Sequence, residues 1–143
     1  MREEDAAILK EIQKNTAMGL KAIHTLSEKV MDEELSRQLD RQSVKYGELN
    51  NRATKRLVDA DAEQYRGSKL QDMMLNASIE ASTMFNTSNS HVAELMIQGS
   101  NRGITDMFKV LKHNERAEEM TVEFAKELMD FEEKSVQKWR EYL

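Results

Sequence analysis

Apolar residues recur along this chain at intervals of three and four, a spacing that places them on one face of an α-helix. Polar or glycine-containing stretches interrupt the pattern between these runs. The pattern therefore predicts helices over residues 3–30, 32–62, 69–85, 91–112 and 115–142. No long alternating pattern typical of β-strands occurs, so the predicted fold class is all-α, in a single domain spanning residues 1–143.

Four of the predicted helices have a distinct apolar face. The inward line of residues 3–30 is Ile8, Ile12, Thr16, Gly19, Ile23, Leu26 and Val30. That of residues 32–62 is Leu35, Leu39, Gln42, Tyr46, Leu49, Ala53, Leu57 and Ala60. That of residues 115–142 is Thr121, Ala125, Leu128, Glu132, Ser135 or Val136, Trp139 and Leu143. The short segment 69–85 has the stripe Leu70, Met73, Met74, Ala77, Ala81, Met84 and Phe85, whose methionines we expect to fill the core.

Residues 91–112 differ from the other segments because their polar side chains fall within an arc of roughly 140°. Apolar and small residues occupy most of the remaining circumference. This segment is therefore predicted to be the central helix, with the others packed around it. Gly99 and Gly103 predict close helix packing there, and Gly19 predicts close approach of a neighbouring backbone to the first helix.

The breaks between segments predict the topology. Asp32, Ser68 and either Ser88 or Ser90 are suitable N-caps, Gln71 completes a capping box with Ser68, and Gly67 suits a C′ position. The first two long helices are joined by a very short turn, and so are the last two, which predicts two antiparallel hairpins. The intervening segment is long enough to return the chain along the length of a bundle.

This arrangement resembles the ferritin-like superfamily. The runs SHVAELMIQGSNRGI and FEEKSVQKWREYL are similar to small uncharacterised bacterial proteins of that superfamily. The resemblance implies an up-down four-helix bundle with a long crossover carrying a short fifth helix. It also implies a di-iron or di-manganese carboxylate site, used for iron storage, oxidation or peroxide reduction.

The metal site implied by that resemblance is tested by its ligand pattern, a Glu from each of two helices and Glu-x-x-His from the other two. No Glu-x-x-His occurs in this chain. The inward positions at mid-bundle are polar but carry one carboxylate, which cannot neutralise two divalent cations. The first helix offers Asn15, on the edge of its inward line, and Thr16, and the last helix offers Glu132 with Ser135 three residues later. The candidate ligand-binding residues of this layer are Thr16, Gln42, Tyr46, Ser100 and Glu132. No catalytic residue, metal ligand or cofactor is therefore predicted.

The same polar layer allows two interpretations. Its members can hydrogen-bond across the bundle and set the register of the helices. Alternatively, they can form a small-ligand or single-ion site walled by Gln42, Tyr46 and Glu132. Under either interpretation we expect Glu132 to be buried and paired with a hydroxyl or amide from the first two helices, unless the inward line is rotated and Glu132 faces solvent.

Composition narrows the other possibilities. The absence of cysteine excludes disulfides, thiolate zinc sites and thiol catalysis. The net charge of −5, with charges of both signs interleaved, argues against a nucleic-acid partner. No apolar run approaches the roughly 20 residues needed to cross a membrane. Because MREEDAAILK lacks the apolar core of a signal peptide, a cytoplasmic location is expected.

These patterns favour a non-catalytic helical-bundle binding or interaction protein whose protein or small-molecule partner is unknown. A homo-oligomer, specifically a dimer, is expected. One alternative is a ferritin-like metal-binding protein, for iron or manganese storage or as an oxidoreductase, with an atypical ligand set. The other is a self-assembling structural protein that uses the wide apolar face of residues 91–112.

Overall fold

The computed structural model describes residues 1–143 and consists of five α-helices with no β-strand. The helices are α1 (Glu3–Ser27), α2 (Glu33–Asp59), α3 (Lys69–Thr83), α4 (Asn89–His113) and α5 (Glu119–Arg140). The all-helical prediction is confirmed, with each boundary within about four residues of its predicted position. None of the five helices is both long and apolar enough to cross a membrane.

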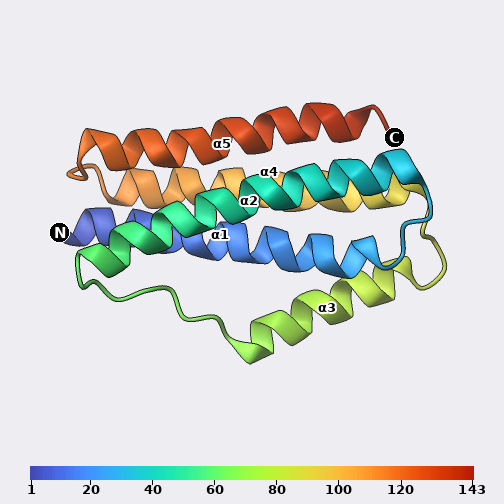
Figure 1. Ribbon diagram of the computed structural model, residues 1–143, viewed down its shortest axis with the longest axis horizontal. Helices are drawn as coiled ribbons and strands as arrows, with labels where there is room; N and C mark the ends of the chain where they lie inside the picture. The colour runs from blue at the N-terminus through green and yellow to red at the C-terminus, as the bar shows by residue number, and fades with distance from the viewer.

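Two antiparallel hairpins make up most of the molecule, as the short turns predicted. Figure 1 shows α1 beside the antiparallel α2, and α4 beside the antiparallel α5. The connector after α2 and the helix α3 carry the chain back to the end where α2 began. Consequently α2 and α4 run in the same direction, and the two chain termini lie at opposite ends of the molecule.

The predicted N-caps form, but Gly67 does not occupy a C′ position. Asp32 Oδ1 accepts from the Leu35 amide at 2.8 Å, and the Ser68 and Ser88 hydroxyls cap α3 and α4 in the same way. After α2, the left-handed residue is Asp61, with φ of 51°, rather than Gly67. Asp tolerates this conformation, and the chain closes with the Ala62 amide bonded to the Leu57 carbonyl, which ends α2 before Gly67 is reached.

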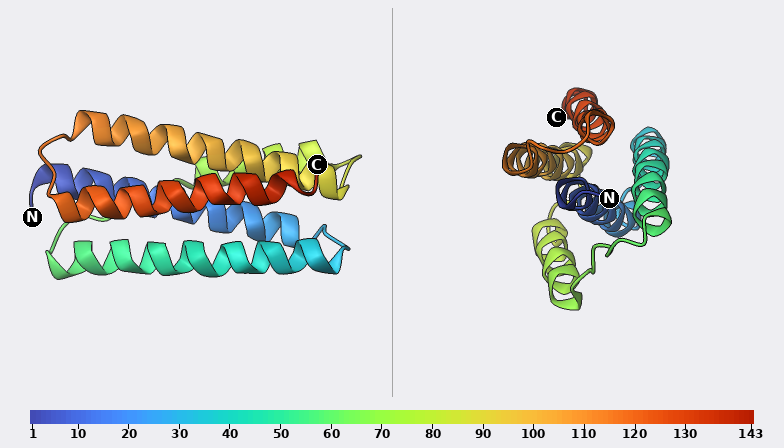
Figure 2. Two further views of the ribbon diagram at one scale, coloured as in Figure 1. Left: turned by 90° about the horizontal axis from the view of Figure 1, so that it is seen from above. Right: turned by 90° about the vertical axis from the view of Figure 1, so that its left-hand side faces the viewer.

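The helix at the centre is α1, which corrects the expectation for residues 91–112. α1 packs against all four other helices, and the end-on view in Figure 2 places it between α5 and α3. α4 packs on α1 and α5 only along one side, so Phe108 remains 58% exposed and Ile104 half-buried. The wide apolar face of α4 is therefore only partly covered.

The inward lines of α1, α2 and α5 are largely as predicted. Most of their members, including Trp139, are buried in one core. Two predicted positions are wrong: Ala60 follows the last turn of α2 and is exposed, and Leu143 lies beyond α5 and is exposed.

The face of α3 that lies against α1 is not its apolar stripe. The buried residues of α3 are Ile79 and Thr83, whereas the stripe from Leu70 to Phe85 faces solvent. Polar contacts explain this orientation. Asp72 and Glu80 form ion pairs with Lys21 and Lys29 of α1. Together with a hydrogen bond from Thr25 to Asn76, these ion pairs hold the face that also carries Ile79 and the partly buried Leu75 against α1.

The N-terminus of α5 is capped by a side chain from the other end of the sequence. Glu118 makes no side-chain cap of its own, and its amide donates to Oδ1 of the buried Asp5 at 2.9 Å. Arg2 also donates to the Arg116 carbonyl at 3.0 Å. These contacts hold residues before Glu119 outside the helix, and they explain why α5 starts later than predicted.

Replacing Asp5 should therefore destabilise the protein through α5. We expect Asp5→Ala to lower the free energy of unfolding by about 1 kcal/mol, the usual cost of removing a helix cap. Glu3→Ala, an exposed substitution in the same turn, should change it by much less. Urea unfolding followed by circular dichroism measures both, and equal effects from the two variants would disprove a capping role.

Candidate functional site

The mid-bundle polar layer forms around Glu132 of α5. This side chain is 1% exposed. Its Oε1 accepts from Asn15 Nδ2 of α1 at 2.8 Å, and its Oε2 accepts from the Tyr46 hydroxyl of α2 at 3.1 Å. The expectation of a buried Glu132, paired with an amide and a hydroxyl from the first two helices, is confirmed.

The other predicted site residues are buried but do not all join this layer. Ser135 Oγ lies 2.9 Å from Gln42 Oε1, which makes a second contact between α2 and α5. Thr16 Oγ1 donates to its own helix, at the Ile12 carbonyl. The buried Ser100 hydroxyl has no hydrogen-bond partner. A ligand-binding role for Thr16, Gln42, Tyr46, Ser100 and Glu132 stays a prediction.

Two residues that complete the layer were absent from the predicted site. Asn15 supplies one of the two hydrogen bonds to Glu132, although it lies on the edge of the inward line of α1. Gly103 leaves the space that the carboxylate fills, since a Cβ atom there would lie 2.5 Å from Glu132 Oε2. One signal in the sequence was available for Gly103: it follows Ser100 by three residues on the inward side of α4.

Tyr46 is held in place by contacts of its ring with α5 and with α1. Its ring contacts Phe131 edge-on, with the ring centroids 5.1 Å apart. It also lies against Gly19 of α1, where a Cβ would be 2.8 Å from Tyr46 Cζ. Gly19 therefore accommodates a tyrosine ring, and the expectation that it admits a neighbouring backbone is wrong.

Burial changes the titration of both acidic groups. It raises the pKa of Glu132 from 4.5 to about 7, against the opposing effect of the hydrogen bonds from Asn15 and Tyr46. Burial is the main reason that the pKa of Tyr46 lies well above 10, and the nearby charge of Glu132 is the second. Tyr46 therefore remains a protonated donor, while Glu132 changes charge near neutral pH.

These residues do not fit the di-metal site of the ferritin-like superfamily. Both oxygens of Glu132 already accept hydrogen bonds from this chain. The nearest groups are amides, hydroxyls and the phenol, which do not supply the negative charge that two divalent cations require. No three His, Asp or Glu side chains lie close enough together to hold a metal ion.

A polar cavity of about 260 Å³ lies between α1, α2 and the connector that precedes α3. Gln13 links its walls, with Nε2 donating to Thr54 and Oε1 accepting from the Tyr65 amide. Asn50 donates to both the Gln13 carbonyl and Thr16 Oγ1. Thr16, which is fully buried, is thus bonded to the cavity residue Asn50 and has no bond to Glu132.

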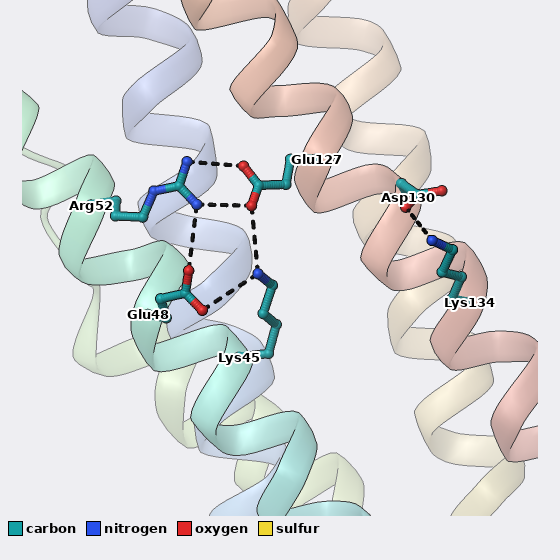
Figure 3. Close-up of polar contacts among 6 residues, drawn as sticks. All are labelled: Lys45, Glu48, Arg52, Glu127, Asp130 and Lys134. Carbon is teal, nitrogen blue, oxygen red and sulfur yellow. Dashed lines mark hydrogen bonds and ion pairs between the residues drawn. The ribbon is translucent and has the colours of Figure 1, made fainter.

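A charged cluster joins α2 and α5 at the protein surface, as Figure 3 shows. Arg52 binds both carboxylate oxygens of Glu127, at 2.8 and 2.9 Å, and Lys45 and Glu48 extend the cluster. The hydrogen bond with Arg52 lowers the pKa of Glu127. Because Arg52 and Glu127 are both more than one third exposed, solvent screens the pair. The cluster aligns α2 with α5 but offers no uncompensated charge to a ligand.

No family model, curated protein or solved structure matches this chain.

Proposed function

We propose that this chain is a non-catalytic helical-bundle binding or interaction protein. The observation that supports this best is the state of Glu132, the one carboxylate on the inward faces at mid-bundle. Its two oxygens are occupied by Asn15 and Tyr46, so the group closes an internal hydrogen-bonded layer. A layer bonded in this way stabilises helix register, and both oxygens of its one carboxylate are already engaged within the chain.

We also propose that the bundle is a bacterial member of the ferritin-like superfamily that lacks the di-metal site. Two antiparallel hairpins, joined by a crossover that returns along the bundle, are the topology expected of that superfamily. The two sequence stretches named above support the same proposal.

Metal loading tests this proposal against the metal-binding alternative. The protein is incubated with Fe(II) or Mn(II) without oxygen, desalted, and analysed for metal per chain. We expect no stoichiometric retention, and the Glu132→Gln variant should give the same result as the native protein. Retention of about two metals per chain, lost in Glu132→Gln, would establish a ferritin-like metal site and overturn the proposal.

A further inference from the structure

The outer face of α3 is the largest run of uncovered apolar side chains in the molecule. Five large residues there expose between 63% and 94% of their surface, and they follow one stripe: Leu70, Met73, Met74, Met84 and Phe85. The end-on view in Figure 2 shows α3 on the side of α1 opposite α5, with this outer side free. Patches of this kind mark interaction sites.

The spacing within the stripe is that of a helix–helix contact. Leu70, Met74, Ala77, Ala81 and Met84 are separated by four, three, four and three residues, as in the packed seam of two helices. The exposed Ala77 and Ala81 lie in the middle, where small side chains let two backbones approach closely. Leu70, Met73 and Met74 precede them in α3, and Met84 and Phe85 follow directly after the last helical residue, Thr83.

The charges of α3 exclude most other partners. Its two carboxylates, Asp72 and Glu80, are engaged by Lys21 and Lys29 of α1. No charged residue lies between Met73 and Ile79, in a chain that is 33% charged overall. Nucleic acids and charged peptides need a complementary charge, which the stripe itself does not carry. The exposed cations Lys69 and Arg66 flank its start, but the polar face of α3 carries two carboxylates, whereas a surface-bound membrane helix has Lys and Arg along its polar face. This face matches a partner that is equally apolar and neutral.

We propose that α3 is a dimerisation helix, and that its outer face packs on the same face of a second copy of this chain. In an antiparallel pair related by a two-fold axis, the alanines meet at the centre and the large side chains of opposite ends meet each other. Each copy contributes on the order of 600 Å² of apolar surface, judged from the five exposed side chains. The pair thus buries about 1,200 Å², the lower limit for a specific interface.

This inference rests on the proposed interaction role and identifies the partner. The first test compares Met74→Glu with Val44→Glu by sedimentation equilibrium between about 1 and 100 µM. Val44 is an isolated exposed apolar residue on α2, and it serves as the matched control. We expect a native dimer, weakened at least about a hundredfold by Met74→Glu because the buried stripe would contain an unpaired charge, and unchanged in Val44→Glu.

The second test uses the absence of native cysteine. Single Ala77→Cys and Val44→Cys variants are oxidised under mild conditions and separated on a non-reducing gel. We expect a covalent dimer from Ala77→Cys, which lies near the two-fold axis, and none from Val44→Cys. Circular dichroism of each variant checks that its helical content equals that of the native protein.

Two results would overturn the inference. The first is a monomer at all concentrations, whether or not it binds neutral or anionic lipid vesicles through α3, and the second is a dimer that Met74→Glu does not weaken. In the second case the interaction role would survive with a different interface. Stoichiometric metal uptake would instead reject the proposed function, whatever the oligomeric state.

Discussion

The free energy of unfolding should fall by about 3 kcal/mol as pH rises from 4.5 to above 7, through the titration of Glu132 alone. Burial raises the folded-state pKa of this group from 4.5 to about 7, so the folded protein binds its proton more tightly than the unfolded chain does. The resulting stabilisation is complete below pH 4.5 and is lost as pH rises through 7. Ionisation then leaves a buried carboxylate with two hydrogen bonds and no cation.

The Glu132→Gln variant isolates this effect from other carboxylates. Glu127, for example, contributes with the opposite sign, since Arg52 lowers its pKa and stabilises the fold at higher pH. The measurement is urea unfolding at several pH values from 4 to 8.5, expressed as native minus variant. We expect a difference that declines with pH for Glu132→Gln and a flat one for Glu133→Gln, its exposed neighbour. Equal pH profiles for native protein and Glu132→Gln would show that Glu132 is not buried in this way.

The sequence predicted the elements better than it predicted their surroundings. Helical spacing and capping residues such as Asp32 and Ser88 are local signals, and the structure reproduces them. The line containing Tyr46 and Glu132 was also predictable, because polar residues within an apolar face must find partners. Their meeting depends on how the two hairpins pack, because α2 and α5 belong to different hairpins.

The errors arose where an apolar face was assumed to be a buried face. The wide face of α4 suggested a central helix, but coverage depends on how many neighbours a helix has, and α1 has the most. The stripe of α3 points outward because Asp72 and Glu80 pair with lysines of α1. Such pairs between distant segments leave no periodic signal in the sequence. Asn15 was underestimated for the same reason, since only the approach of α5 makes it the partner of Glu132.

Gly103→Ala should destabilise the protein by about 2–3 kcal/mol, although alanine is the better helix former. The new Cβ would lie 2.5 Å from Glu132 Oε2 and 2.7 Å from Asn15 Nδ2. These atoms cannot move apart freely, because they bond to each other in a buried layer. Relief of the contact must displace the ends of Glu132 and Asn15, together with the hydrogen bonds that Glu132 accepts in this buried layer, or shift α4. We expect either displacement to outweigh the gain of about 1 kcal/mol in helix propensity.

Gly99→Ala, one turn earlier in α4, provides the matched control. No atom lies within 4 Å of a Cβ built at Gly99, and the residue is exposed. This substitution should therefore stabilise the protein by about 0.5–1 kcal/mol. Urea unfolding measures the change in the free energy of unfolding for both variants. Because the two substitutions are identical and lie in one helix, changes of opposite sign must come from what each glycine faces. If both variants were stabilised, the new Cβ at residue 103 would have to displace the Glu132 carboxylate at little cost. The polar layer could then not hold the helices in register.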